Sequence, residues 1–221
     1  MAEAERLFTE AAALAGPRLT ALARAERLTT IKEKHVQETF KTGLEERAFT
    51  ARPRPSVSPS LSHGLKREWP RLGLFDISLR WRGVDVFGEL KCGEEALTLS
   101  ACGWDAAKGV FCLQHGVGAG MLLVAAAPAT MWEKPGVGTE LFFDGEWDME
   151  DIRTRYAAGF RKWEGDGYKP DYVFRRLRTL NVGCTEPFGI GGTDWLIGIS
   201  RVEPVDDERM DWVPFLAEAA S

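Results

Sequence analysis

The sequence predicts an α/β protein in which helices flank a mixed β-sheet. Its composition, 44% hydrophobic and 28% charged residues, is that of an ordinary globular domain and excludes wholesale disorder and fibrous repeats. Helix-forming residues dominate before the proline-rich stretch 51–70, and hydrophobic residues alternate with a period of two after it. The expected order is helix, two strands, helix and strand, followed by further helices and strands. This order is typical of a layered α/β domain.

One domain, 1–221, is expected, because a chain of 221 residues is close to the usual size of a single domain. Proline forbids a regular element within 51–70, so we interpret that stretch and its flanks as a connection. The expected parts are N-terminal helices at 1–48, a proline-rich connection at 49–72, a core at 73–128 and a C-terminal elaboration at 129–221.

Periodicity, helix formers and caps predict the individual elements. The alternating segments Leu74–Trp81 and Val84–Lys91 are separated by Arg82-Gly83, which predicts an antiparallel hairpin. Asp148 and the acidic residues after it are typical of a helix start. We expect helices at Ala2–Ala15, at about Leu19–Ala48 after a break at Gly16-Pro17, at Trp104–His115, Asp148–Trp163 and Pro170–Leu180, and further strands at Leu97–Ser100, Met121–Ala127, Leu180–Val182 and Asp194–Val202.

The hairpin register brings charged residues together. If Arg82-Gly83 is a two-residue loop, Asp76 falls directly opposite Glu89. Opposite residues of an antiparallel pair lie on the same face, with Cβ atoms about 4.5–5.5 Å apart. Lys91 lies two residues beyond Glu89 and therefore points to that face as well. The sequence thus predicts two carboxylates and an amine on one patch of an otherwise apolar sheet.

Two carboxylates this close repel each other unless a cation lies between them or one of them is protonated. Their oxygen atoms are the ligands that Mg²⁺ or Mn²⁺ prefers, and such ions also keep waters and substrate phosphates in their coordination shell. Lys91 adds a positive charge that could stabilise a developing phosphorane or help position an attacking water. This combination is suited to hydrolysis of a phosphodiester.

Asp76, twelve intervening residues and then Glu89-Leu90-Lys91 resemble the PD-(D/E)XK, or restriction-endonuclease-like, nuclease superfamily. The resemblance covers roughly 20–128 and implies a restriction-endonuclease-like core and a metal-dependent nuclease that hydrolyses DNA. A helical glutamate often completes the metal site in that family, and Glu38 matches it best by position. The resemblance thus implies Glu38, Asp76 and Glu89 as ligands of Mg²⁺ or Mn²⁺, and these three with Lys91 as catalytic residues. Phe75 stands where the family usually has proline.

The net charge of -5 counts against a protein that coats nucleic acid without specificity. However, residues 153–178 hold eight basic and three acidic residues, and aromatic residues lie between them. This segment could bind a phosphate backbone, although arginines on a solvated face are the alternative interpretation. The candidate nucleic-acid-binding residues are Lys108, Gln114, Arg161, Lys162, Arg175 and Arg176.

Two other interpretations of the patch remain open. Asp76, Glu89 and Lys91 could form a cross-strand salt-bridge cluster, or the chain could be an inactive member of the same fold that acts as a protein-interaction or assembly module. In that second case the acidic segment 133–151 and exposed tryptophans would contact a protein partner. DNA or RNA and a homodimer are the other partners left open. A cytoplasmic location is expected, because no C-x-x-C pair, signal peptide or membrane-length apolar segment is found.

Overall fold

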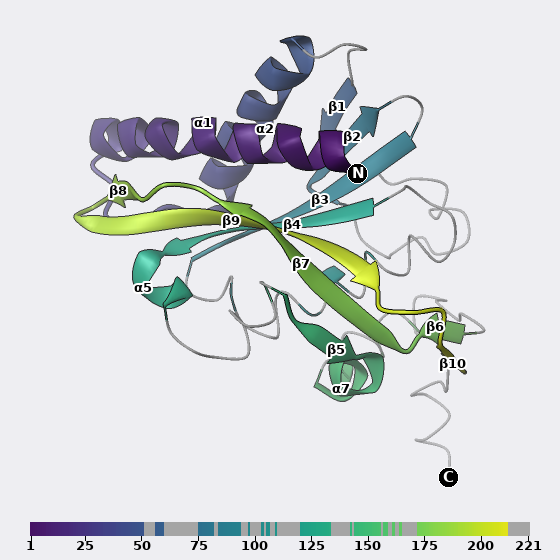
Figure 1. The fold of residues 1–221 in the computed structure, drawn as a ribbon. Coiled ribbons are helices and arrows are strands. Elements are labelled where there is room, and N and C mark those ends of the chain that lie inside the picture. The colour runs from purple at the N-terminus through teal and green to yellow at the C-terminus, as the bar shows by residue number, and fades with distance from the viewer. Residues whose placement is uncertain are drawn as a thin grey trace.

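A mixed β-sheet with helices on both sides forms the centre of the protein (Figure 1). The computed structural model describes residues 1–50, 56–59, 75–81, 84–93, 97, 103, 105–106, 109, 120–133, 142, 144–155, 157–158, 161, 164 and 172–211. The α/β class and the mixed sheet expected from the sequence are therefore confirmed.

The strands of the central sheet follow the spatial order β1-β2-β3-β4-β9-β7-β5, and β8 pairs with the N-terminal end of β9. Among the described strands, β3 and β4 run parallel to each other, and the other neighbours in this sheet are antiparallel. A separate pair, β6 and β10, lies beside it. The bounds are β1 Ser56–Pro59, β2 Ile77–Trp81, β3 Val84–Cys92, β4 Gly120–Pro128, β5 Glu146–Asp148, β6 Tyr172–Phe174, β7 Arg176–Cys184, β8 Phe188–Ile190, β9 Thr193–Pro204 and β10 Arg209–Asp211.

The predicted hairpin register is confirmed. Trp81 pairs with Val84 and Ile77 pairs with Gly88, which is the register that a two-residue loop predicts. Asp76 lies one residue before β2, where this pairing ends, and the Leu90 amide donates to its side chain. The turn residues themselves lie outside the described part of the chain. The expected strands in the second half are also present within β4, β7 and β9.

Helices α1 (Ala2–Glu26) and α2 (Glu33–Thr50) cover one face of the sheet, as Figure 1 shows. Phe8 of α1 and Phe40 of α2 are fully buried and meet edge to face, with ring centroids 5.4 Å apart. Alternate residues of β3, namely Val86 and Leu90, belong to the same core. Phe87, Glu89 and Lys91 therefore project from the opposite face of β3.

The break expected at Gly16-Pro17 is wrong, because α1 continues through both residues. Pro17 is exposed, so the carbonyl group of Ala13 that loses its helical partner lies on the solvent side of the helix. Gly16 is buried against Phe188 of β8, and this packing holds the helix in place across the proline. The helix ends instead after Glu26, where Arg27 adopts a left-handed conformation with φ 55°. The single helix expected over Leu19–Ala48 is accordingly divided in two.

Three other expected elements differ. Strand β1 lies inside the proline-rich connection, where no element was expected, because an edge strand tolerates proline. The helix expected at Pro170–Leu180 is wrong, since β6 and β7 occupy this segment. In β7, buried Leu177 and Thr179 alternate with less buried arginines, which is the period of a strand. Leu97 is helical rather than extended.

On the second side of the sheet lie α5 (Ala129–Trp132), α7 (Met149–Arg155) and helical residues between 103 and 109. The predicted start of the helix after Asp148 is confirmed: its carboxylate accepts a hydrogen bond from the Glu150 amide at 2.8 Å. The helix expected at Trp104–His115 is described only at Asp105, Ala106 and Gly109, which are helical, and the rest lies outside the described residues. In the described part of the chain, no helix combines the length and apolarity needed to cross a membrane.

Close packing of α1 on β3 predicts that Gly88→Ala destabilises the protein. A Cβ atom on Gly88 would lie 2.8 Å from Cε1 of Phe8, whose side chain is fully buried and has little room to move. We expect a loss of about 1–3 kcal/mol in the free energy of unfolding, measured by urea denaturation. The matched control is Gly189→Ala in β8, where the added Cβ meets nothing within 4 Å. Equal stability of the two variants would contradict this packing.

Candidate functional site

The Asp76 carboxylate lies where β2 begins and is held from two sides. Its Oδ1 accepts a hydrogen bond from Nε2 of Gln37 on α2 at 2.9 Å, and its Oδ2 accepts one from the Leu90 backbone amide of β3 at 2.7 Å. Next to it, the Phe75 ring stacks on that of Phe87, with centroids 4.4 Å apart. The position of Asp76 is thus fixed by both a helix and the neighbouring strand.

Glu89 follows Gly88, the last residue of β3 that pairs with β2, and is almost fully buried, with 3% of its surface exposed. Its strand has neighbours on both sides, because β3 also pairs with β4 and places Glu89 beside Leu123. A buried carboxylate is costly unless polar or cationic groups surround it. The hairpin and the parallel strand together therefore keep a carboxylate in a partly dehydrated position at the end of the sheet.

Lys91 follows on the same face of β3 and forms an ion pair with Asp105. Its Nζ lies 2.9 Å from Oδ2 of Asp105; the lysine side chain is 29% exposed and the aspartate side chain 2% exposed. Burial by itself favours the neutral amine, but Asp105, Glu89 and Glu33 outweigh it and raise the pKa of Lys91 above its ordinary value. Lys91 is therefore a persistent cation at neutral pH.

The first turns of α2 supply a third carboxylate. Nε2 of Gln37, which contacts Asp76, also donates to Oε1 of Glu33 at 3.1 Å, since residues four apart share one helix face. Burial raises the pKa of Glu33, the negative charges of Asp76 and Asp105 raise it further, and Lys91 opposes them. We call this group the carboxylate site; it comprises Glu33, Gln37, Asp76, Glu89, Lys91 and Asp105.

Glu38, which the sequence favoured as the helical acid, lies outside the carboxylate site. Its side chain is exposed even though Ile31 and His35 are buried, so the expectation that Glu38 faces inward with them is wrong. Gln37, one residue earlier, is the α2 residue that reaches Asp76. The sequence signal for this helix face was the pair of polar residues at 33 and 37, because residues four apart lie on the same side of a helix.

His35 and Cys92 lie close to the carboxylate site but have structural contacts. Nδ1 of His35 accepts a hydrogen bond from the Lys32 amide at 3.2 Å, which caps the first turn of α2. Burial, and then the charge of Glu33, raise the pKa of the Cys92 thiol to about 12. The protonated thiol donates to the Ile31 carbonyl oxygen at 3.6 Å.

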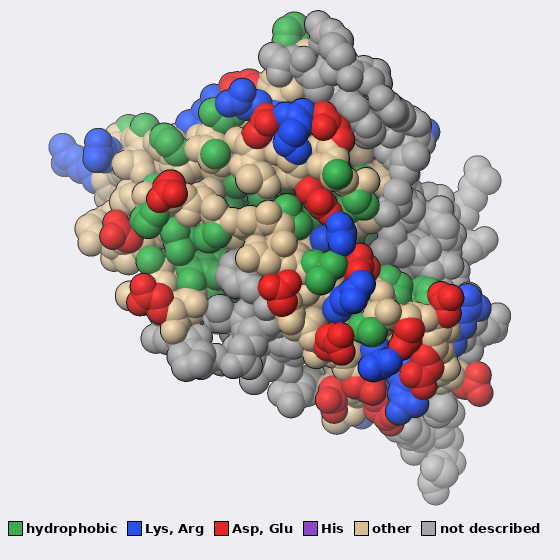
Figure 2. Space-filling view, in the orientation of Figure 1, with side chains coloured by type: hydrophobic (Ala, Val, Ile, Leu, Met, Phe, Trp, Pro, Cys, Tyr) green, Lys and Arg blue, Asp and Glu red, His purple; other side chains and the backbone are tan. Residues whose placement is uncertain are grey.

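The expected nucleic-acid contacts are only partly described, and two of them are paired with acids. Arg175 lies 3.0 Å from Glu208, and Arg176 forms an ion pair with Asp206. Arg161 is exposed. Figure 2 shows acidic and basic side chains next to one another over this part of the surface. Arg175, Arg176 and Arg178, three of the eight basic residues in 153–178, are thus paired with acids that are distant in the sequence. Lys108, Gln114 and Lys162 lie outside the described residues.

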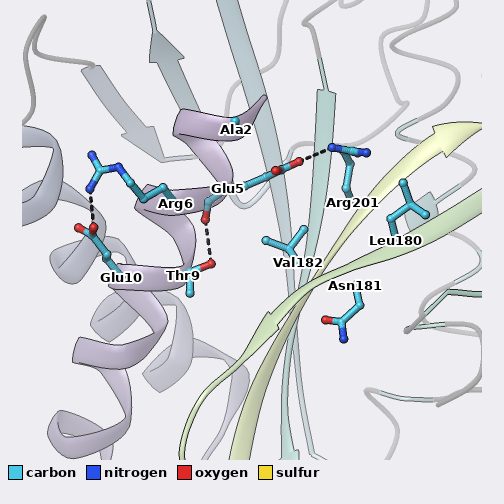
Figure 3. A pocket seen from close by; sticks show the side chains of 9 residues that line it. All are labelled: Ala2, Glu5, Arg6, Thr9, Glu10, Leu180, Asn181, Val182 and Arg201. Carbon is cyan, nitrogen blue, oxygen red and sulfur yellow. Dashed lines mark hydrogen bonds and ion pairs between the residues drawn. The ribbon is translucent and has the colours of Figure 1, made fainter.

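A separate open groove of about 410 Å³ lies between the start of α1 and strands β7 and β9 (Figure 3). Its lining includes Glu5 and Arg201, which form an ion pair at 2.6 Å, and Arg6, which pairs with Glu10. The charges of the groove are therefore already matched within the protein, and we assign it no chemistry.

The donor atoms of the carboxylate site suit a hard divalent cation better than a transition metal that prefers nitrogen or sulfur. Mg²⁺ is commonly bound through one or two carboxylates and completes its shell with waters and phosphate oxygens. Asp76 and Glu89 provide such a pair. Within the described residues, no three His, Cys, Asp or Glu side chains form a ready-made metal cage. The oxygen donors of Asp76 and Glu89 are of the kind that Mg²⁺ prefers, and the rest of the coordination shell of such an ion would come from waters and substrate.

Comparisons with protein-family models, with curated proteins and with solved structures found no match. The carboxylate site is therefore the feature of this chain from which a function can be inferred.

The raised pKa of Glu33 predicts a pH-dependent stability. Because the folded-state pKa lies above the ordinary value of 4.5, ionisation of Glu33 costs folding free energy, and this cost appears as the pH rises through that range. The Glu33→Gln variant should therefore gain stability relative to wild type between about pH 4 and about pH 7, as measured by urea unfolding. Glu38→Gln, which removes the same charge outside the carboxylate site, is the control. A difference that shrinks as the pH rises would contradict the prediction.

Proposed function

We propose that this protein is a metal-dependent nuclease with a restriction-endonuclease-like core, which hydrolyses phosphodiester bonds in DNA. The observation that carries the proposal is the hairpin register, whose first pair is Ile77 with Gly88. Asp76 comes directly before that pair and Glu89 directly after it in the partner strand, and Lys91 projects from the same face of β3 as Glu89. The order α2, β1, β2, β3, a helical segment and the parallel strand β4 is consistent with that core. DNA is the proposed substrate on the basis of the family resemblance of these residues.

Asp76 and Glu89 are the proposed metal-binding residues. When bound, Mg²⁺ or Mn²⁺ would act as a Lewis acid on the scissile phosphate and lower the pKa of a bound water. Asp76 is kept in place by Gln37 and by the Leu90 amide, so its orientation does not depend on the cation. Glu33 is the carboxylate that α2 brings to the same end of the sheet, in the role that the sequence suggested for Glu38.

Lys91 is proposed to stabilise negative charge rather than to remove a proton. A general base must be neutral at the working pH, whereas the pKa of Lys91 is raised by Asp105 despite the burial of the amine. Phosphodiester hydrolysis adds negative charge to the phosphate oxygens in the transition state. A fixed ammonium that lies near the charge of Glu89 supplies the matching positive charge.

An inactive protein with this fold, acting as an interaction or assembly module, is the second candidate. One observation favours it: both oxygens of Asp76 already accept hydrogen bonds from protein groups, and Lys91 is already paired with Asp105. Side chains whose hydrogen bonds and ion pairs are all made within the protein can stabilise the end of a sheet without binding a ligand. Metal binding and cleavage separate the two candidates.

We expect the purified protein to cleave at least one of supercoiled DNA, linear duplex DNA, single-stranded DNA or RNA when Mg²⁺ or Mn²⁺ is present. Lys91→Ala should lower the cleavage rate by about 100-fold or more, the usual effect of removing one transition-state charge partner. Gel-based cleavage assays of parallel preparations provide the measurement. Glu38→Gln, prepared in the same way, should cut as wild type does. A protein that cuts no substrate, or a Lys91→Ala variant with full activity, would exclude the nuclease.

Calorimetric titration with Mn²⁺ tests the metal site without any substrate. We expect binding to the wild-type protein and at least a tenfold weaker affinity in Asp76→Asn, because one of two carboxylate ligands is lost. Asp85→Asn, which removes a carboxylate from the other end of β3, should bind as wild type does. The interaction-module alternative predicts no heat of binding in any of the three proteins.

A further inference from the structure

The connection between β3 and β4 places a helical segment over the face from which Lys91 projects. Two parallel strands require a crossover, and the described residues of this one are helical at Asp105, Ala106 and Gly109. A Cβ atom on Gly109 would lie 2.0 Å from Sδ of Met121, so the segment packs directly on β4 there. Met121 is the register partner of Phe87 and shares the face of Lys91.

Asp105 is a buried member of the carboxylate site and forms an ion pair with Lys91. It is 2% exposed, and its Oδ2 lies 2.9 Å from the lysine Nζ. A lysine side chain has four flexible torsions and about 2 kcal/mol of rotamer entropy, so a free ammonium samples many positions. A partner fixed by burial in a packed helical segment removes most of that freedom. The same ammonium belongs to a side chain on the face of β3 from which Glu89 projects two residues earlier.

We propose that Asp105 is a positioning residue, which holds the Lys91 ammonium in the carboxylate site through the buried ion pair. The catalytic part of this role rests on the proposed nuclease function. Asp105 does not reach the substrate itself; it orders the cation in advance, so that no reorganisation is needed when charge develops on the phosphate. No local sequence pattern pointed to Asp105, because the ion pair joins a strand to a helical segment fourteen residues later.

The first test measures the ordering of Lys91 directly, in the metal-free protein. NMR relaxation of lysine side-chain ammonium groups should give a higher order parameter for Lys91 than for exposed Lys34 of α2. In the isosteric variant Asp105→Asn, the order parameter of Lys91 should fall to that of Lys34. The wild-type comparison of the two lysines stands on its own if the variant does not fold. An order parameter of Lys91 as low as that of Lys34 in wild type, or unchanged in Asp105→Asn, would overturn the proposal.

The second test separates positioning from general stability. We expect Asp105→Asn to lower kcat at least tenfold with little change in KM, because ground-state binding of substrate does not involve this pair. Asp105→Glu, which keeps the charge, should restore part of kcat. The control is Glu164→Gln, which removes another buried helical carboxylate, 3% exposed, and should retain wild-type kcat. An equal loss of kcat in the control, or no loss in Asp105→Asn, would overturn the catalytic role.

The two proposals can fail separately. If wild-type protein cleaves nothing but Lys91 loses its order in Asp105→Asn, the nuclease is excluded and the positioning by Asp105 is supported. If wild-type protein cleaves and Lys91 is equally mobile with and without the Asp105 carboxylate, the nuclease stands and the positioning is excluded.

Discussion

The pairing register of β2 with β3 is the constraint on which the rest of the site depends. Side chains alternate between the two faces of a strand, so a slip by one residue would move Glu89 to the face covered by α1 and α2. A buried carboxylate beside Phe8 and Phe40 would be strongly destabilising, whereas the observed register places the apolar side chains of Val86 and Leu90 there. The hydrophobic core thus fixes the face of β3 from which Glu89 projects, and the hydrogen bond from the Leu90 amide holds the Asp76 side chain at the end of the same hairpin.

Charged groups are concentrated where the sheet ends, and each is held by a different element. Asp76 is bound by α2 and β3, Lys91 by the crossover after β3, and Glu33 by the first turn of α2. Such an arrangement is expensive to bury, because every ion loses water, and it persists only when partners compensate the loss. The raised pKa of Glu33 indicates that the positive charge of Lys91 does not fully offset the loss of water around this carboxylate. Incomplete compensation of a carboxylate is a common property of sites that later accept a cation or substrate.

The hairpin and its register could be predicted from the sequence, because the length of the loop and the alternation of apolar residues are features of a short, continuous segment. Such local features did not predict the contacts of Gln37, Asp105 or Glu33, since these residues come from segments that only the folded topology brings together. The arginines of β7 illustrate the same limit. Their spacing suggested an unbalanced basic surface, but Glu203 and Asp206, more than twenty residues away, neutralise Arg178 and Arg176. Helix α1 likewise passes Pro17 because tertiary packing outweighs local propensity.

The position of β9 in the sheet has a consequence for biosynthesis. It lies between β4 and β7, although it is made after both of them. While the ribosome is still adding residues before Thr193, one edge of β4 has no partner strand, and its apolar residues can pair with another nascent chain. The ion pair from Glu5 to Arg201 then joins the first helix to this late strand. The centre of the sheet is therefore completed only after Thr193–Pro204 has been made, because β4 and β7 are joined through this later strand.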